Sequence, residues 1–184
     1  RGLAKFPALF GEIRQPEKTY LMIPSVSSER RPFIPVALQP PSIIASNLCL
    51  AVPGATVYHL GVIASTMHMA WVRYVAGRLE SRYRYSNQIV YNNFPWPPDP
   101  SDRQIAAIEE RAQAVLDARA LYPDSSFADL YDPTAMPPEL RKAHTELDKA
   151  VDAAYGRKSF NSDAERVAFL FGLYQQYTSL LPAD

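Results

Sequence analysis

A run of basic, aromatic and amide side chains near the middle of the sequence has the residue types that contact nucleic acid. The run LESRYRYSNQIVYNN (79–93) contains Arg82, Tyr83, Arg84, Tyr85 and Asn87 almost in a row. Arginine and asparagine can form paired hydrogen bonds with base edges, and tyrosine hydroxyl groups reach phosphates. We therefore predict that these residues lie on a DNA-binding surface, with the two arginines mainly in contact with phosphates.

A second candidate is the run VSSERRPFIP (26–35), which contains Ser28, Glu29, Arg30 and Arg31. It lies between two strand-like runs, so we predict a hairpin-like loop. In an extended segment Glu29 and Arg31 share one face, and Arg30 points away. A carboxylate beside a guanidinium can read a C·G pair, because it accepts from cytosine N4 while the guanidinium binds guanine. The alternative is an ordinary surface ion pair, which contributes about 0–1 kcal/mol.

The charges of the sequence are divided between its two halves. Residues 1–98 contain ten Lys and Arg against four Asp and Glu, and residues 99–184 contain nine against fifteen. The halves therefore carry net charges of +6 and −6, and a polyanion is attracted only to the first. Eight of its ten cations are arginine, and Arg73 and Arg78 join the candidates because they adjoin the run above. The alternative is a chance fluctuation on a solvated surface.

Residue types that catalysis or metal binding requires are present but not suitably spaced. His59, His68 and His144 do not have the spacing of metal ligands, so we predict structural roles for all three. The seven glycines are scattered singly, which leaves no phosphate-binding loop. Cys49 lies in the apolar run LCLAV and is interpreted as a small buried side chain. The sequence therefore predicts no catalytic residue, no metal site and no cofactor site in this chain.

The segment NNFPWPPDP (92–100) contains a partial copy of a catalytic motif. Amino-methyltransferases hold the target base with Asp/Asn/Ser-Pro-Pro-aromatic, and Asn93-Phe94-Pro95-Trp96 matches this pattern only loosely, because Phe follows the Asn. We interpret residues 93–98 as a rigid structural joint between two domains.

Proline spacing divides the first half into short β-rich runs. Twelve of the seventeen prolines fall within residues 1–100, and prolines end strands because they cannot donate to a ladder. The spacing predicts strands in small, partly antiparallel sheets, at 19–24, 33–38, 42–46, 48–52, 56–60 and 88–93. Apolar residues at helical spacing predict one helix that begins near Ser65 and ends near Gly77.

Capping patterns predict three helices in the second half. Ser101 with Gln104 and Ser162 with Glu165 are capping-box pairs, and Pro138 suits the first turn of the helix between them. The prediction is thus an α+β fold, in which small mixed or antiparallel sheets are followed by a three-helix C-terminal domain. The stretch without charges, residues 32–72, is interrupted by five prolines and predicts no membrane span.

Three stretches resemble the C-terminal third of class I DNA adenine-N6 methyltransferases, a group that includes the MmeI-type restriction-modification enzymes. They are residues 10–35, residues 67–97 with YNNFPWP, and residues 114–144 with LYDP-x-x-MPPELRKAH. The resemblance implies that residues 1–98 are the C-terminal portion of a DNA target-recognition domain. It implies that residues 99–184 are a helical C-terminal domain.

The resemblance also implies the partners of the chain. These are double-stranded DNA and an upstream methyltransferase domain of the same polypeptide, which holds S-adenosylmethionine and transfers a methyl group to a flipped adenine. The sequence begins without methionine, so we expect it to be cut from a longer chain. A single cysteine fits a cytoplasmic bacterial enzyme.

Two other classes of function remain open at this stage. The acidic second half could bind a partner subunit, as a protein-interaction scaffold of a multi-subunit phage-defence system. An independent enzyme is the third alternative, and no group of residues supports it.

Overall fold

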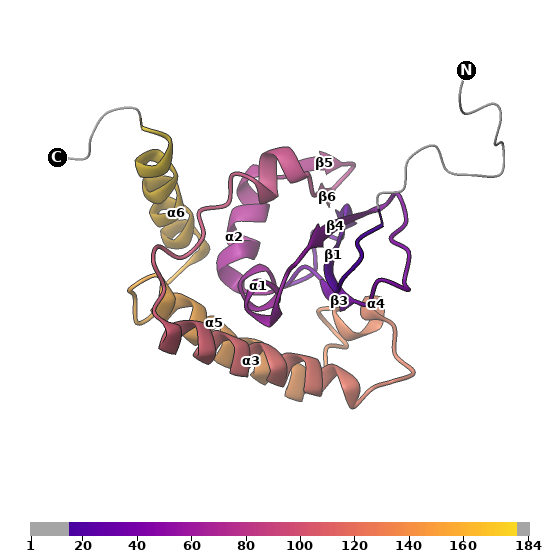
Figure 1. Cartoon of the computed structure of the whole chain (residues 1–184). Helices are drawn as coiled ribbons and strands as arrows, with labels where there is room; N and C mark the ends of the chain where they lie inside the picture. Colours follow the sequence, from indigo (N-terminus) through magenta and orange to yellow (C-terminus); the bar gives the residue numbers. More distant parts are fainter. Residues whose placement is uncertain (1–14, 180–184) are drawn as a thin grey trace, which may run out of the picture.

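The computed structural model of the protein describes residues 15–179, in which six short strands and six α-helices are joined by irregular loops (Figure 1). The strands form two antiparallel three-stranded sheets. The second half of the described chain is helical. This architecture confirms the predicted α+β class.

The first sheet has the strand order β3-β1-β4, with β1 (Tyr20–Pro24), β3 (Ala37–Gln39) and β4 (Cys49–Pro53). Alternation along β1 buries Leu21 and Ile23 completely on the inner face, whereas Met22 on the outer face is partly exposed. Strands are thus confirmed in 19–24 and 48–52, and β3 uses only the end of 33–38. Cys49 is half-buried rather than buried as expected.

The second sheet has the order β2-β6-β5, with β2 (Val26–Ser27), β5 (Gly77–Leu79) and β6 (Arg82–Arg84). Strands β5 and β6 form a hairpin, and Val26 of β2 pairs with Arg84 of β6. Because β2 comes immediately before the Ser28–Arg31 segment, the two candidate runs of the sequence meet at this sheet.

Two helices connect the sheets: α1 (Val57–Ile63) and α2 (Thr66–Val75). The Ser65 side chain accepts from the backbone N–H of His68, and α2 ends just before Gly77, as predicted. The strand expected at 56–60 is wrong, because this segment begins α1. The β-branched residues there favour a strand locally, but burial of Leu60 to Ile63 against the helices of residues 102–120 and 138–154 outweighs that preference.

The strand expected at 88–93 is also wrong. This segment forms η2 (Asn87–Tyr91), a π-helical turn. The Asn93 side chain donates to the backbone oxygens of Gln88 at 2.8 Å and Ile89 at 3.1 Å, and these bonds close the turn.

No strand forms at 42–46. The backbone oxygen of Ile43 accepts instead from the Tyr20 hydroxyl at 2.7 Å and from the Gln15 amide at 2.8 Å. These side-chain bonds replace the ladder bonds that a strand would need.

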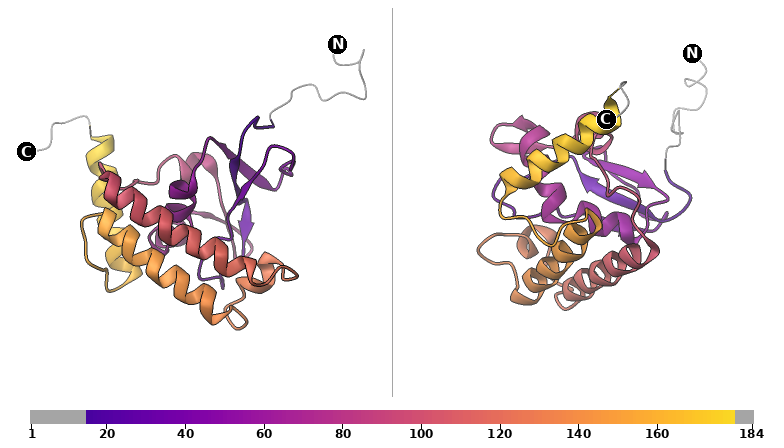
Figure 2. Two further views of the ribbon diagram at one scale, coloured as in Figure 1. Left: turned by 60° about the horizontal axis from the view of Figure 1, so that its bottom comes forward. Right: turned by 90° about the vertical axis from the view of Figure 1, so that its left-hand side faces the viewer.

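The three predicted C-terminal helices are present, with a short additional one. They are α3 (Asp102–Ala120), α4 (Phe127–Leu130), α5 (Pro138–Ala154) and α6 (Asp163–Thr178). The Ser101–Gln104 capping box begins α3, and the Ser162 side chain caps α6. Helices α3 and α5 lie side by side, whereas α6 packs against α2 (Figure 2).

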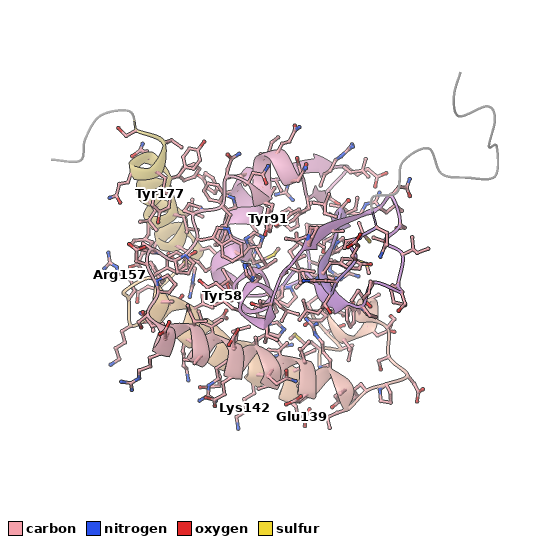
Figure 3. The ribbon with its side chains drawn as sticks, in the orientation of Figure 1. Tyr58, Tyr91, Glu139, Lys142, Arg157 and Tyr177 are labelled. Atoms are coloured by element: carbon pink, nitrogen blue, oxygen red, sulfur yellow. The ribbon has the colours of Figure 1, made fainter. Side chains whose placement is uncertain are left out.

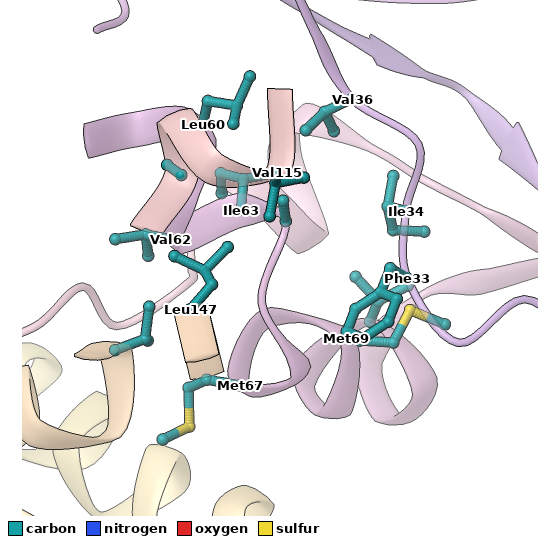
Figure 4. Packing of buried hydrophobic residues seen from close by; sticks show 14 of the residues in the cluster. Phe33, Ile34, Val36, Leu60, Val62, Ile63, Met67, Met69, Val115 and Leu147 are labelled. Atoms are coloured by element: carbon teal, nitrogen blue, oxygen red, sulfur yellow. The ribbon is translucent and has the colours of Figure 1, made fainter. Parts of the chain in front are cut away.

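One hydrophobic core runs through both halves of the described chain (Figure 4). Helix α1 contacts α3 closely because Gly61 has no side chain at the crossing. A Cβ atom there would lie 2.7 Å from Ile108 Cγ2, 3.0 Å from Ala112 Cβ and 3.4 Å from Leu147 Cδ1. The first half of the chain therefore rests directly on helices α3 and α5.

No helix within residues 15–179 is long and apolar enough to cross a membrane. No three His, Cys, Asp or Glu side chains in the described range are grouped so that they could hold a metal ion.

Candidate nucleic-acid interface

The β5–β6 hairpin ends in a two-residue turn that holds an acidic and a basic side chain together. Leu79 pairs with Arg82, so Glu80 and Ser81 form the turn. Glu80 Oε2 lies 2.8 Å from Arg82 Nη2, and the two side chains keep 77% and 45% of their surface exposed. Glu80 has a φ of 57°, in the left-handed region that favours glycine. Strained backbone conformations of this kind are frequent at ligand-binding sites.

Alternation along β6 separates the residues of the basic run. Arg82 and Arg84 are exposed, whereas Tyr83 between them is only 5% exposed. Arg84 has no carboxylate within ion-pair distance in the part of the chain that the structure describes. Its guanidinium group is therefore available for an anion or a base.

Arg84 lines a groove of about 380 Å³ between the second sheet and the loop before β4. The polar lining residues are Ser25, Asn47, Arg84, Ser86 and Asn87, and the remaining lining is largely apolar. Amide, hydroxyl and guanidinium groups are the donors and acceptors that recognise base edges. The groove thus combines base-reading chemistry with an unpaired cation.

Asn87 lines this groove, and only the oxygen of its side-chain amide is used within the described part of the chain. Its Oδ1 atom accepts from the backbone N–H of Gln88 at 2.9 Å, while the residue stays exposed. The side-chain NH₂ group has no hydrogen-bond partner among the interactions of the described residues and can donate to a ligand.

Arg73 and Arg78 have partners within the chain. Arg73 Nη1 forms an ion pair with Asp163 at the start of α6. Arg78 Nη1 donates to the backbone oxygen of Ser81 at 3.1 Å, and its guanidinium carbon lies 4.1 Å from the centre of the Tyr83 ring. These two arginines, expected at the DNA surface, connect parts of the protein to one another.

Tyr83 and Tyr85 are buried, although Tyr85 also lines the groove beside Arg84. Tyr85 is 3% exposed, and its hydroxyl lies 2.9 Å from Nε2 of His68. Burial lowers the pKa of His68 to about 3 and raises the pKa of Tyr85 well above 10.0. Both groups are therefore neutral near pH 7, and their contact joins α2 to the end of β6 beneath the groove. Burial of the two side chains does not support the expected DNA contact, which stays a prediction for both.

The Ser28–Arg31 segment is a turn rather than an extended stretch. The Arg31 N–H donates to the Ser28 backbone oxygen at 3.2 Å, and the Arg30 N–H donates to Ser28 Oγ at 3.3 Å. Because the backbone turns here, the alternation that would place Glu29 and Arg31 on one face does not apply, and the two side chains form no ion pair among the described residues. Arg31 lines a separate hollow of about 300 Å³ on the outer face of the first sheet.

Two residues of the candidate surface were not expected from the sequence. Glu80 forms the exposed pair with Arg82, and Asn47 lines the groove beside Arg84. The sequence could have identified Glu80 as a turn residue, because Glu80 and Ser81 separate the two short strand-like runs at 77–79 and 82–84. Asn47 is brought to the groove by the pairing of β4 with β1, which no local signal indicates.

The histidines and the aromatic joint have the structural roles predicted for them. His59 Nδ1 accepts from the Thr56 N–H at 3.1 Å at the start of α1. His144 is buried, and its Nε2 lies 2.9 Å from the Tyr131 hydroxyl. The Pro95 oxygen accepts from the buried Tyr155 hydroxyl at 2.7 Å, which fixes the joint at 93–98 to α5.

Helices α3 and α5 form a layer on the side of the molecule away from the β5–β6 hairpin (Figure 1). Figure 3 shows Glu139 and Lys142 projecting outward from this layer, opposite β5 and β6.

Comparison with known proteins assigns a family to each part of the chain. The family model described as the MmeI target recognition domain matches residues 1–98, and that of the MmeI C-terminal domain matches residues 100–182. The chain is 43% identical over 176 residues to DNA methyltransferase A of Bacillus subtilis (strain 168). It is 52% identical to the type IIL restriction-modification enzyme MmeI, whose structure in complex with DNA aligns with a TM-score of 0.91.

These relatives are much longer than the present chain. The match to the methyltransferase covers 96% of this chain and 20% of the relative. The match to the MmeI structure covers 98% of this chain and 24% of that one.

Proposed function

This chain belongs to the MmeI family of target recognition and C-terminal domains, and we propose that it binds double-stranded DNA and selects a short base sequence for a methyltransferase. The observation that carries this proposal is the groove beside the β5–β6 hairpin. It places the unpaired Arg84 guanidinium among amide and hydroxyl side chains, next to an exposed Glu–Arg pair. A hairpin is narrow enough to enter the major groove of B-DNA.

Glu80 and Arg82 have the chemistry to read one C·G pair. The carboxylate accepts from the amino group of cytosine, and the guanidinium group binds the O6 and N7 atoms of guanine. A carboxylate repels phosphates, so an acid beside a base at the tip favours base edges over the DNA backbone. The hypothesis first made for Glu29 and Arg31 therefore applies better to Glu80 and Arg82, which are paired in the structure, and it replaces the phosphate contact expected for Arg82.

Unpaired arginines supply the contacts with phosphates. Arg84 at the groove and Arg30 and Arg31 on the Ser28–Arg31 turn have no ion-pair partner among residues 15–179. Each phosphate that they neutralise releases counterions and makes binding dependent on salt.

The remaining chemistry is assigned to the part of the longer protein that this chain does not include. We propose that an upstream domain there binds S-adenosylmethionine and methylates adenine at N6, in the bacterial cytoplasm, as part of restriction-modification. The support is the resemblance of the sequence and the names of its relatives.

Filter binding of the chain to a duplex of unrelated sequence tests the proposal. Between about 50 and 200 mM salt, affinity should fall steeply, and Arg84→Ala should make the slope of log K against log salt shallower by roughly 0.9. The matched control is Lys142→Ala, which removes an exposed cation from α5 and should leave the slope unchanged. Binding without salt dependence, or equal effects of the two variants, would instead favour a protein-interaction scaffold.

A further inference from the structure

We propose that Arg78 is a positioning residue, which holds the Glu80–Ser81 turn in the geometry that base reading requires and does not itself contact DNA. This inference rests on the proposed function, because it assigns a role within the same recognition hairpin. It also replaces the sequence-based prediction that Arg78 binds DNA.

The Arg78 guanidinium group lies between two backbone oxygens that belong to different elements. Nη1 donates to the Ser81 oxygen in the hairpin turn at 3.1 Å, and Nη2 lies 3.5 Å from the Arg73 oxygen in the last turn of α2. The Arg73 oxygen is one of the last four carbonyls of α2, which have no partner within the helix. The negative end of the helix dipole also favours a cation at this place.

The Tyr83 ring supports Arg78 from below. Arg78 and Tyr83 are paired across the hairpin, and the guanidinium carbon lies 4.1 Å from the ring centre. Tyr83 is 5% exposed, so its ring is fixed by the core. Two carbonyl contacts and one ring contact therefore define the position of a side chain that is itself exposed.

The turn needs such support because its backbone is strained and its strands are short. Glu80 has a φ of 57°, and β5 and β6 contain three residues each. Such a conformation persists in a residue other than glycine only when its surroundings determine it. Arg78 contacts the backbone oxygen of Arg73, and the Arg73 side chain forms an ion pair with Asp163 that joins α2 to α6. The turn is thus held in place relative to the C-terminal helices.

Two variants separate positioning from phosphate contact. Arg78→Lys keeps the charge but cannot bridge the two carbonyls in the same way, and Arg78→Met removes the charge and the donors but keeps an apolar stem. The preferred sequence of the wild-type chain is first obtained by binding selection from a pool of random 30-base-pair duplexes. Affinity is then measured for that sequence and for its single-base-pair variants, at several salt concentrations.

Positioning predicts that both variants lose base discrimination while the salt slope stays within half a unit of wild type. The preference at one base-pair position should fall by about tenfold in each, because a misplaced reader no longer distinguishes the base. Arg84→Met is the control that should reduce the salt slope. A shallower slope for Arg78→Met, with full discrimination in Arg78→Lys, would show that Arg78 contacts a phosphate and would overturn the inference.

Hydrogen exchange without DNA keeps the test independent of the proposed function. In both variants the amides of residues 77–85 should exchange faster, whereas those of α3 and α5 should not change. Unchanged exchange in the hairpin would overturn the positioning role even if DNA binding were altered. Failure of the wild-type chain to bind any duplex would instead reject the proposed function, and faster hairpin exchange would then still support the structural contact.

Discussion

Replacing Gly61 by alanine tests whether the recognition half is seated on the helical layer. The added Cβ would lie 2.7 Å from Ile108 Cγ2 and 3.0 Å from Ala112 Cβ. Ala112 Cβ is attached directly to the α3 backbone, and Ile108 Cγ2 is a branch methyl, so neither can move without a shift of the helix or of a rotamer. Gly172 in α6 is the matched control, because a Cβ there would meet no atom within 4 Å.

Two opposing effects determine how much each variant changes the free energy of unfolding. Alanine is favoured over glycine within a helix by about 1 kcal/mol, and this gain applies at both positions. Overpacking of a filled core costs about 1–3 kcal/mol, and it applies at Gly61 alone. Gly61→Ala should therefore lower the free energy of unfolding by up to about 2 kcal/mol, whereas Gly172→Ala should raise it by up to about 1 kcal/mol.

Urea denaturation of the chain, followed by tryptophan fluorescence and by circular dichroism, measures both effects. The difference between the two variants should be about 1–3 kcal/mol, because the gain in helix propensity is common to both, and the m-values should be similar. A Gly61→Ala chain as stable as the Gly172→Ala chain would refute the close seating of α1 on α3.

Three further perturbations have defined outcomes. Burial lowers the pKa of both His68 and His144 to about 3, below the unfolded value near 6.5. The free energy of unfolding should therefore fall as pH drops from 6.5 towards 3, by up to about 1.4 kcal/mol per pH unit for each histidine. Denaturation at pH 7 and at pH 5 measures this fall, and equal stabilities at the two pH values would contradict it. Burial raises the pKa of Asp148 from 3.8 to about 6, so its contribution to stability is lost as pH rises through that range. Asp148→Asn should therefore raise the free energy of unfolding by about 1–2 kcal/mol at pH 7 and should leave it unchanged below pH 4. A lower free energy of unfolding at pH 7 would show that the carboxylate is favoured over the amide. Glu80→Gly should relieve the backbone strain and raise the melting temperature slightly while it reduces base discrimination, and unchanged discrimination would exclude Glu80 as a reader.

Sequence signals predicted correctly those helix starts that depend only on neighbouring residues in the chain. The capping box of Ser101 and Gln104 and the proline at the start of α5 identified two helix starts correctly. The run 56–60 failed because burial against α3 decides its conformation, and sequence alone does not show that neighbour. A short apolar run of this kind is compatible with either a strand or a helix.

The candidate site was predictable in composition but not in geometry. Alternation along a strand, if applied to 82–85, would have placed Arg82 and Arg84 on one face and the two tyrosines on the other. The partners of Arg73 and Arg78 depend on where α6 and the hairpin turn lie, which follows only from the tertiary fold. Asn47 reaches the groove through strand pairing across more than twenty intervening residues.

The measurement that tests the central claim most directly is the base preference of a charge-exchanged hairpin. Binding selection from a random duplex pool would compare the wild-type chain with the double variant Glu80→Lys, Arg82→Asp, and with Glu29→Lys, Arg31→Asp as the parallel exchange on the other turn. The account predicts that the hairpin exchange changes the preferred base at one position, where the original base then costs about 1–3 kcal/mol, while the other exchange leaves the preferred sequence unaltered. Selection of the same sequence by the hairpin variant and the wild type would contradict the assignment of this hairpin as the reader.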